Sequence, residues 1–418
     1  MDTHKKLTIG LFGFGVVGEG LYKVLLQTPS LKATIKKVCI KDAGKKREAP
    51  ASLFTTDKWE LLNDPEINVI VEVINETDAA LEIVTTALKN GKDVVSASKK
   101  MLAENLELLL HLQKETGRSL LYEAAACASI PVIRNLEEYY DNDLLHSLRG
   151  IVNGSTNFIL TKMFEENLGF KEALLLAQQL GFAESDPKLD VEGIDAVNKM
   201  SLLLMHAYGI LKHPSQIAFT GIQQINASDA AVAKEKRFDI KLVAQAKKLL
   251  NGKVAGFVMP QFVRQDGHLS FVKNEYNGVV LESSFADKQF FYGKGAGSFP
   301  TASAVLSDLS ALRYQYQYEY KKRFHHQAAE LSNDFYVRAY ISFDDWSYIP
   351  RDKFMAIEEW HAEAERKYLV GIVHFSELRE NSWWKENNTS LILYPEAIIE
   401  DLEVRKIKKL SLELAGLI

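Results

Sequence analysis

The chain has 418 residues, enough for two or three domains of ordinary size. Hydrophobic residues make up 47% and charged residues 25%, which excludes a disordered tail protein, a collagen-like repeat and a disulfide-stapled small domain. Fifty Lys and Arg residues against 55 Asp and Glu residues leave a formal charge of −5, a balance that argues against a nucleic-acid partner or an anionic membrane surface.

The two cysteines, Cys39 and Cys127, lie far apart and form no CxxC pair, so we expect free thiols in a reducing compartment. Apolar stretches such as residues 201–211 are shorter than the ~18 residues that a membrane span needs. The charged start and apolar run near the N-terminus resemble a signal peptide, but glycines and Glu19 interrupt the run and no cleavage site follows. We therefore expect a cytoplasmic protein.

The first 134 residues alternate short apolar runs with helical patterns, which predicts βαβ units and a parallel sheet with helices on both faces. Strands are expected at residues 7–12, 35–40, 68–74, 93–96 and 119–122, and helices at residues 17–26, 79–90 and 105–116. The predicted fold class is α/β, with a Rossmann-type, doubly wound nucleotide-binding domain over residues 1–134.

Helical and β-rich patterns mix after residue 134, which predicts an α+β substrate-binding domain over residues 135–300. Helices are expected at residues 170–180, 195–211 and 239–250, and strands at residues 254–263, 269–273 and 278–283. Residues 301–325, with a helix at 301–312, are expected to return to the nucleotide-binding domain.

A third composition covers residues 335–418. Strands are expected at residues 336–343, 368–374 and 390–394, and a helix at residues 352–365. This order predicts a small appended domain of the βαβ type.

The sequence Gly13-Phe14-Gly15-Val16-Val17-Gly18 matches the GxGxxG pattern, directly after the first expected strand and at the start of a helix. One glycine permits the tight turn, one lets the backbone approach a pyrophosphate, and one lets helix and strand pack closely. The N–H groups at the helix start then face the phosphates. We predict that this loop binds a dinucleotide; the alternative is a related fold that has lost its ligand.

The end of the second expected strand should contact the adenosine ribose, where an acidic residue favours NAD(H) and a cation favours NADP(H). Lys41 and Asp42 follow this strand, and Lys45 begins a run of three basic residues. The basic residues Lys41 and Lys45 favour NADP(H), while Asp42 keeps NAD(H) open. A solvated charged loop without a cofactor role is a further alternative.

Five carboxylates precede Lys199 within residues 184–199, in a loop that leads into a helix. Asp195 and Lys199 are four residues apart and share one helical face. A lysine held beside carboxylates can donate a proton to a developing alkoxide. Otherwise the pair is a surface salt bridge, Glu184 and Asp186 are solvated loop residues, and Asp190 is a charge at a helix start.

Three motifs occur together in the second half of the chain. They are Gly-Ile-Val-Asn-Gly-Ser-Thr-Asn-Phe-Ile-Leu at residues 150–160, the acidic stretch at residues 181–199, and Gly295-Ala296-Gly297 followed by Pro-Thr-Ala-Ser-Ala-Val at residues 300–305. In order and spacing they resemble the homoserine dehydrogenase family, from about residue 7 to about residue 325. The resemblance implies NAD(P)H-dependent, reversible reduction of L-aspartate 4-semialdehyde to L-homoserine in threonine, methionine and isoleucine biosynthesis.

The resemblance implies a role for each matching residue. Lys199 matches the catalytic lysine that protonates the new alkoxide, and Asp195 matches the acidic residue that orients it. Glu184 matches the residue that holds the substrate's amino group, Asp186 supports that pocket, and Lys99 matches a lysine near both cofactor and substrate. The loop with Gly295 and Gly297 is expected to contact the cofactor.

The family also has a site for a monovalent cation, sodium or potassium. Its ligands are one carboxylate and several backbone carbonyls, which here match Glu123, Ala126, Ala128 and Ile130. The family's glycine run is replaced in this segment, so we expect costly φ values at Cys127 and Ser129.

Two segments depart from the family pattern. Asn75 and Glu76 replace two glycines near the nicotinamide, which could alter cofactor preference in a direction that the sequence does not give. Many bacterial members end in a threonine-binding ACT domain, but residues 342–350 lack the ligand-loop glycine and contain three aromatics. We therefore expect an ACT-like fold that is a degenerate sensor or a dimer-interface element. The family also implies a homodimer or a higher homo-oligomer.

Two other functions are open from the sequence. Aspartate-semialdehyde dehydrogenase chemistry needs a cysteine nucleophile with a histidine base, a context that Cys39 and Cys127 lack. A non-catalytic NADP(H)-sensing or interaction protein would use the acidic loop only as charged surface. The joint presence of Glu184, Asp195 and Lys199 argues against that alternative.

Overall fold

The computed structural model describes residues 5–142, 144–326, 328–363, 366–381, 383–385 and 389–400, and these form two compact units. Unit 1 contains residues 5–142, 201–214, 291–326 and 328. Unit 2 contains residues 144–200, 215–290 and the described residues from 329 onward. Residues 401–418, the end of the expected C-terminal domain, lie outside the described residues, and the division into three domains stays a prediction.

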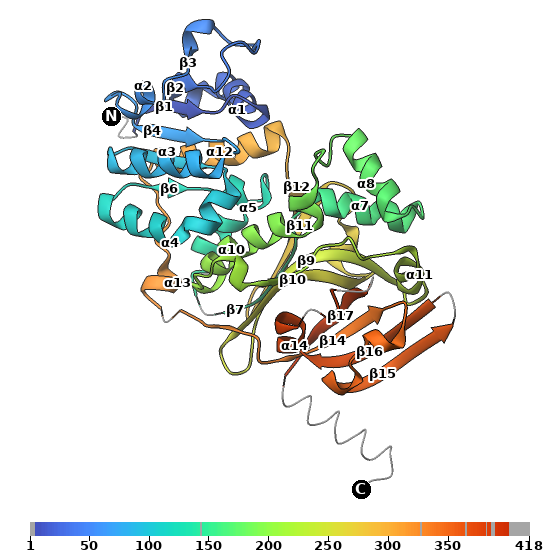
Figure 1. Ribbon diagram of the computed structural model, residues 1–418. Coiled ribbons are helices and arrows are strands. Elements are labelled where there is room, and N and C mark those ends of the chain that lie inside the picture. Colours follow the sequence, from blue (N-terminus) through green and yellow to red (C-terminus); the bar gives the residue numbers. More distant parts are fainter. Residues whose placement is uncertain are drawn as a thin grey trace. The chain divides into compact units, whose positions relative to one another are not determined.

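Unit 1 contains a six-stranded parallel sheet with the order β3-β2-β1-β4-β5-β6. Its strands are β1 (Leu7–Phe12), β2 (Ala33–Cys39), β3 (Phe54–Thr55), β4 (Val69–Glu72), β5 (Asp93–Ser96) and β6 (Leu120–Leu121) (Figure 1). Its helices include α1 (Val16–Gln27), α2 (Trp59–Leu62), α3 (Thr77–Lys89), α4 (Lys99–Thr116), α5 (Ala124–Cys127) and α6 (Val132–Arg134). Since βαβ crossovers are right-handed, the reversal of strand order at β1 places α1 on one face and α3 and α4 on the other.

The predicted strands and helices of residues 1–134 are confirmed, with small differences at their ends. The largest difference is in α4, which begins at Lys99 and has non-helical backbone angles at Asn105, where the predicted helix begins. The doubly wound α/β fold is therefore present, and the loops that follow β1, β2 and β4 lie at one edge of the sheet.

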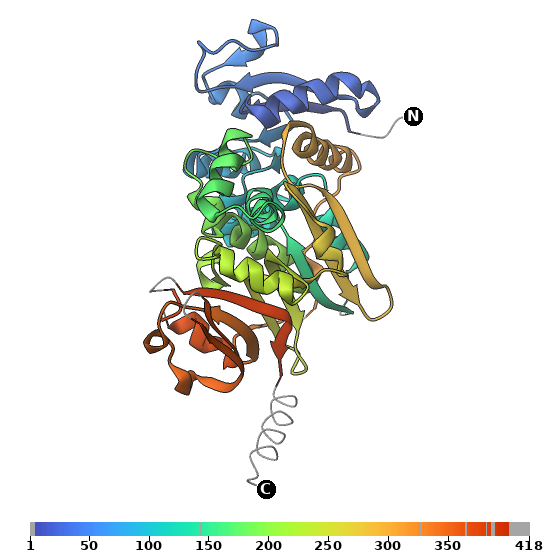
Figure 2. The same ribbon diagram turned by 90° about the vertical axis from the view of Figure 1, so that its right-hand side faces the viewer.

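Helix α12 (Ser298–Leu312) also belongs to unit 1 and lies beside α1 (Figure 2). The two helices approach closely because α1 has a glycine at the contact. A Cβ added to Gly20 would lie 2.4 Å from the Ser298 hydroxyl oxygen. The short helix α13 (Lys321–Phe324) follows in the same unit.

Unit 2 is built on a mixed sheet with the strand order β12-β11-β7-β9-β10-β17-β14-β16-β15, while β8 and β13 pair with β10. The strands are β7 (Leu145–Ile151), β8 (Ala218–Phe219), β9 (Phe238–Lys248), β10 (Val254–Arg264), β11 (Tyr276–Ser283), β12 (Asp287–Lys294), β13 (Leu331–Ser332), β14 (Tyr336–Ser342), β15 (Phe354–Glu363), β16 (Arg366–His374) and β17 (Ser390–Ile399). The helices are α7 (Gly154–Glu165), α8 (Phe170–Gln179), α9 (Lys188–Val191), α10 (Ile194–Tyr208), α11 (Ala227–Glu235) and α14 (Phe375–Glu380), of which α10 continues into unit 1.

The helix predicted at residues 239–250 is wrong, because this segment is the strand β9. β9 pairs with β10 from end to end, from Phe238 opposite Arg264 to Lys248 opposite Val254. Nearly all of β9 is buried, so the alternation of exposed and buried residues that marks a strand is missing. Long-range pairing therefore overrides the local pattern.

Two further predictions are wrong. The strand predicted at residues 269–273 is a short 3-10 helix, His268–Phe271, and the carbonyl of Val272 accepts hydrogen bonds from side chains. The helix predicted at residues 352–365 is β15, an edge strand in which half of the residues are exposed, with no clear period of two. The described C-terminal residues thus contain β14, β15, β16, α14 and β17 in that order, in place of the predicted βαβ order.

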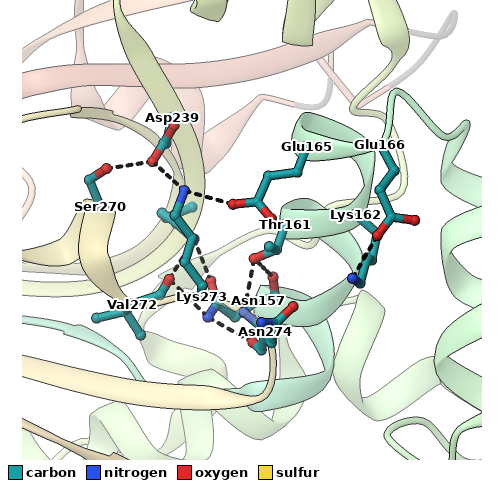
Figure 3. A network of polar contacts seen from close by, with 11 residues as sticks. Asn157, Thr161, Lys162, Glu165, Glu166, Asp239, Ser270, Val272, Lys273 and Asn274 are labelled. Atoms are coloured by element: carbon teal, nitrogen blue, oxygen red, sulfur yellow. Dashed lines mark hydrogen bonds and ion pairs between the residues drawn. The ribbon is translucent and has the colours of Figure 1, made fainter.

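Helix α7 is held on the sheet of unit 2 by a buried polar network (Figure 3). The Asn157 amide donates to the carbonyls of Val272, Asn274 and Tyr276. The ammonium of Lys241, on β9, donates to the Asn157 side-chain oxygen at 2.8 Å and to the Val272 carbonyl at 2.7 Å. These bonds fix α7, which is preceded by its N-cap residue Asn153, a member of the site described below for unit 2.

Within the described residues, no helix is both long and apolar enough to span a bilayer.

Candidate functional site

Each glycine of the GxGxxG loop has a separate steric role in unit 1. At Gly13 φ is +97°, and an added Cβ would lie 3.0 Å from the Val73 carbonyl oxygen. A Cβ on Gly18 would lie 2.1 Å from the Gly13 carbonyl oxygen, so a side chain here would separate α1 from the turn. Gly15, the residue before α1, has open space at its Cβ position. These positions fit the tight turn, the close helix packing and the ligand approach of a dinucleotide-binding loop.

The start of α1 is exposed and lies against a second glycine-containing loop. Val16 is 67% exposed, an unusual position for an apolar side chain, and Val17 is half-buried. Ser298 donates a hydrogen bond to the Val16 carbonyl at 2.7 Å. Gly297, with φ of +112°, is the exposed residue before α12, and Gly295, two residues earlier, is partly buried. The two predicted cofactor loops therefore meet within unit 1.

The loop after β2 is folded by its own polar groups. Asp42 accepts a hydrogen bond from the Gly44 N–H at 2.8 Å, so its carboxylate closes a local turn. Arg47 donates to the carbonyls of Lys45 and Asp42 and lies over the Phe54 ring. Arg47 is thus a structural residue of the loop, whereas the Lys45 side chain is exposed.

Lys41, at the start of this loop, forms an exposed ion pair with Glu76. Glu76 is the residue before α3 and follows Asn75, so both residues that depart from the family lie in the loop after β4. The structure thus brings Lys41 and Glu76 together, a contact that the sequence did not indicate.

A buried carboxylate, Glu72, joins the loops after β4 and β5. It accepts hydrogen bonds from the Ser96 hydroxyl at 2.6 Å, the Ser98 hydroxyl at 2.8 Å and the Ile74 N–H at 2.8 Å. Burial raises the pKa of Glu72, and these hydrogen bonds oppose the rise. Glu72 is not among the predicted site residues, although a single acid at the end of the apolar run Val-Ile-Val is a usable signal.

The Ser98 side chain that Glu72 binds immediately precedes Lys99. Lys99 begins α4 and is half-buried, while its neighbour Lys100 is exposed and lies 3.9 Å from Glu104 on the same helix. The two adjacent lysines therefore differ in exposure, and Lys99 is the less exposed of the two.

The predicted cation segment contains a buried pair of carboxylates. Glu123 accepts hydrogen bonds from the N–H groups of Ile133 and Arg134, each at 2.8 Å. The Glu123 N–H donates to Asp308 at 2.9 Å, and the Arg134 guanidinium lies 2.8 Å from the other oxygen of Asp308. Burial raises the pKa of Glu123 to about 8 and Asp308 adds to that rise, while burial raises the pKa of Asp308 to about 7. Arg134 thus supplies one positive charge for two carboxylates.

The backbone strain of this segment lies at Ala128 and not at the two residues where it was expected. Ala128, one of the three predicted carbonyl ligands with Ala126 and Ile130, has φ of +43°. Cys127 and Ser129 do not have positive φ, so the expectation for these two residues is wrong. A positive φ at an alanine is costly because its Cβ crowds the backbone.

In unit 2 the structure brings Asp195 and Lys199 together in a buried position. The Lys199 ammonium lies 2.8 Å from an Asp195 carboxylate oxygen, and the Lys199 side chain is 5% exposed. It also donates a short hydrogen bond to the Val152 carbonyl, at the end of the loop before α7. A surface salt bridge is therefore excluded for this pair.

Asn153 holds the carboxylates around this lysine. Its amide donates to Asp190 at 2.7 Å and to Asp195 at 2.9 Å. Its side-chain oxygen accepts the Thr156 N–H at 2.8 Å, so the same residue caps α7. Burial, followed by repulsion from Asp195, raises the pKa of Asp190, and the hydrogen bond from Asn153 opposes the rise.

Asn153 and Asp190 were missing from the predicted site residues. An Asn directly before Gly-Ser-Thr at a helix start is a capping signal that could have drawn attention to Asn153. The sequence places Asp190 in the acidic cluster before Lys199, with a charge at a helix start as the alternative, but its contact with Asn153 is set by tertiary structure.

Glu184 and Asp186 lie on an exposed loop of unit 2. The carbonyl of Glu184 accepts a hydrogen bond from Gln178 at 2.9 Å, which orders the loop. Asp186 accepts the Lys188 N–H at 3.2 Å, before the short helix α9. The structure thus separates the buried pair Asp195 and Lys199 from two carboxylates that face solvent.

The doubly wound sheet with its glycine loop, and the buried lysine beside carboxylates, define a dinucleotide-dependent oxidoreductase. Comparisons with known proteins give the same class. The family model "Homoserine dehydrogenase" matches residues 131–310, and the model "Homoserine dehydrogenase, NAD binding domain" matches residues 13–123.

Two relatives and two solved structures illustrate the similarity. The homoserine dehydrogenase of Bacillus subtilis is 38% identical over 317 residues, which cover 74% of this chain and 73% of that protein. That of Lactococcus lactis is 35% identical over 314 residues, covering 72% of this chain and 73% of that protein. The structure of a homoserine dehydrogenase from Thiobacillus denitrificans has a TM-score of 0.81 at 27% identity and covers 94% of this chain and 98% of that one. A hyperthermophilic archaeal homoserine dehydrogenase in complex with NADPH has a TM-score of 0.64 at 26% identity and covers 75% of this chain and 99% of that one.

The chain therefore belongs to the homoserine dehydrogenase family, whose members are NAD(P)-dependent oxidoreductases. This result favours the enzyme over the non-catalytic alternative.

Replacement of Ala128 by Gly should stabilise the protein. Relief of a strained positive φ contributes about 1–3 kcal/mol, and the added freedom of glycine in the unfolded chain removes about 0.4–1 kcal/mol, so we expect a net gain near 1 kcal/mol in the free energy of unfolding. Denaturant unfolding measures this change. Ala125→Gly, in the helical turn α5, is the matched control and should destabilise the protein. Equal losses in both variants would contradict the assignment of strain to Ala128.

Proposed function

We propose that this protein catalyses the reversible reduction of L-aspartate 4-semialdehyde to L-homoserine with a reduced nicotinamide cofactor, in threonine, methionine and isoleucine biosynthesis. The observation that carries the proposal is the buried Lys199, held between Asp195 and the Val152 carbonyl. A positioned ammonium of this kind can transfer a proton to a developing alkoxide.

The proton step follows from the contacts of Lys199. The bound cofactor supplies a hydride from C4 of its reduced nicotinamide to the aldehyde carbon. As the carbonyl oxygen gains charge, the Lys199 ammonium donates a proton to it and becomes a neutral amine, which regains a proton from solvent. In the reverse direction the neutral amine accepts the hydroxyl proton. Asp195 stabilises the ammonium form and fixes the direction of its side chain.

Asn153 and Asp190 support this step as positioning residues. The Asn153 amide and the Lys199 ammonium both contact the same carboxylate oxygen of Asp195, Oδ2. Asp190 shares the same amide, so the two carboxylates keep their separation. In this arrangement the lysine is aligned before substrate binds, which lowers the cost of reaching the reactive geometry.

The roles of the other site residues follow from the family resemblance and from their charge. The carboxylate of Glu184 suits the substrate's ammonium group, and Asp186, which shapes the same exposed loop, supports it. Lys99, at the start of α4, suits a contact with the substrate or the cofactor. An ammonium–carboxylate contact of this kind is charge-assisted and therefore strong for its length.

The cofactor loops favour NADP(H), with use of NAD(H) also open. The backbone of two loops fits a pyrophosphate. The first contains Gly13, Gly15, Val16, Val17 and Gly18, and the second contains Gly295 and Gly297. Lys41 and Lys45 at the end of β2 suit a 2′-phosphate, and the Asp42 carboxylate, which would suit a ribose diol, closes a local turn.

We also propose a site for a monovalent cation at Glu123 and the carbonyls of Ala126, Ala128 and Ile130. Two buried carboxylates share one guanidinium here, so a cation would supply the missing positive charge. A homodimer or a higher homo-oligomer is proposed from the resemblance, as is an ACT-like C-terminal domain that is a degenerate sensor or a dimer-interface element.

Lys199→Ala should lower kcat by at least about 100-fold, because a general acid–base group contributes 10²–10⁴ in rate. The dissociation constant of NADP⁺, measured by fluorescence, should stay close to that of the parent enzyme. The measurement is NADPH oxidation with aspartate semialdehyde. Lys188→Ala, which removes an exposed lysine of the same loop region, is the control and should retain activity. Unchanged turnover in Lys199→Ala would refute the proton-transfer role.

Asn153→Asp should lower kcat by up to about 100-fold, the loss that a misplaced catalytic group can cause. The new carboxylate keeps the helix cap but replaces an amide donor by a third negative charge next to Asp190 and Asp195. Thermal unfolding should therefore change less than activity, and the pH profile of kcat should shift because the charge around Lys199 changes. A variant with the parent pH profile would show that Asn153 has only a capping role.

The cation proposal predicts higher activity in sodium or potassium salts than in tetramethylammonium salt at equal ionic strength, because the large organic cation cannot enter a buried carboxylate site. Glu123→Gln should reduce this difference, with thermal unfolding as the test that the variant is folded. Identical rates in all three salts would contradict the site.

A further inference from the structure

An exposed ion pair joins the loops that follow β2 and β4 in unit 1. The Lys41 ammonium lies 2.6 Å from a Glu76 carboxylate oxygen. In the sheet β1 lies between β2 and β4, so the pair connects the loops on either side of the glycine turn that follows β1. In doubly wound sheets the adenosine ribose and the pyrophosphate bind at this strand edge. The ion pair therefore lies at the cofactor end of the sheet.

The position of Glu76 is fixed by its neighbours in the chain. It follows β4 by a few residues and immediately precedes α3, where its carbonyl accepts the Ala80 N–H at 2.9 Å. The same loop touches the glycine turn, since a Cβ on Gly13 would lie 3.0 Å from the Val73 carbonyl and 3.1 Å from the Ile74 side chain. The Glu76 carboxylate is thus presented from a rigid segment that borders the glycine turn.

Asp42, another acidic residue at this edge, forms a hydrogen bond within its own loop. Asp42, the residue of the β2 loop that would bind a ribose diol, accepts the Gly44 N–H. Arg47, the last residue of the basic run, donates to carbonyls of its own loop. Lys41 and Glu76 are instead paired side chain to side chain, at 87% and 64% exposure. They can therefore reorient toward a ligand without disrupting the loop.

NADP(H) and NAD(H) would interact differently with the ion pair of Lys41 and Glu76. A 2′-phosphate brings about −1.5 to −2 charges, and must compete with Glu76 for the Lys41 ammonium while it is repelled by the Glu76 carboxylate. A ribose diol brings no charge, and its hydroxyl can donate a hydrogen bond to that carboxylate. The hydrogen bond between the two residues raises the pKa of Lys41 and lowers the pKa of Glu76, so both are charged at neutral pH.

We propose that Glu76 is a cofactor-selectivity residue: by pairing with Lys41 it weakens the preference for NADP(H) and supplies an acceptor for the ribose diol of NAD(H). The inference rests on the proposed function, because it concerns the cofactor site of that function. It gives a direction to the effect of one residue that departs from the family pattern. The contact with Lys41 puts this residue beside the loop after β2, where the adenosine ribose binds, and not beside the nicotinamide as the resemblance implied.

The test compares Glu76→Gln with a matched variant on α3, the helix that Glu76 precedes. Glu82 also forms an exposed pair with a lysine, Lys58, and lies six residues further along α3, about 9 Å at 1.5 Å per residue. Glu82→Gln therefore makes the same charge change at the same kind of pair, away from the strand edge. Dissociation constants of NADP⁺ and NAD⁺ are measured by titration calorimetry without substrate, and kcat/KM is measured with NADPH and NADH.

Glu76→Gln should raise the dissociation constant of NAD⁺ relative to that of NADP⁺ by about two- to fivefold, the range expected for one exposed charge. The kcat/KM ratio should move the same way, and both shifts should shrink at high salt because exposed charges are screened. Glu82→Gln should leave both ratios at the parent values. In a Lys41→Gln background, Glu76→Gln should have a smaller effect, because the two residues act as a pair.

A parent-like ratio in Glu76→Gln, or an equal shift in Glu82→Gln, would overturn the inference while leaving the proposed function intact. Failure of the parent protein to bind either dinucleotide would overturn the proposed function, and this inference with it.

Discussion

The amide of Asn153 holds two carboxylates, Asp190 and Asp195, beside the buried Lys199, and the chemistry of unit 2 depends on this contact. Burial of an ammonium and of carboxylates is costly unless each group has charged or hydrogen-bonding partners. Here the lysine has Asp195 and a backbone carbonyl, and the carboxylates share one amide. Because the same asparagine caps α7, and because Asn157 ties α7 to the sheet, the position of the charged centre depends on the packing of this helix.

Unit 1 depends on backbone packing more than on polar side chains. Gly13, Gly18 and Gly20 each stand where a Cβ would meet a backbone or hydroxyl oxygen, so the turn, the start of α1 and the contact with α12 require glycine. In our proposal the exposed side chains of Lys41 and Glu76 then adjust a cofactor site whose shape the backbone has set. Ala128 also has a positive φ, although it is not a glycine.

The parallel strands of unit 1 were predictable because each is a short apolar run separated from the next by an amphipathic helix. The failures have the opposite cause. β9 is buried on both faces and is stabilised by pairing with β10, so its sequence lacks an exposed face. β15 is an edge strand, and half of its residues are exposed. Residues 268–271 form a 3-10 helix just before Val272, whose carbonyl accepts hydrogen bonds from Asn157 and Lys241. In each case pairing or hydrogen bonding with residues outside the segment decided the local structure.

The sequence by itself determined the features whose parts lie close together in the chain. The GxGxxG turn, and Asp195 and Lys199 one helical turn apart, are of this kind, because local geometry converts their spacing directly into proximity. Only the tertiary structure decided the contacts between distant residues: Asn153 with Asp190 and Asp195, Glu72 with Ser96 and Ser98, Glu123 with Asp308, and Lys41 with Glu76. These contacts depend on strand order and on which loops share an edge of the sheet, and residue spacing along the chain does not encode either.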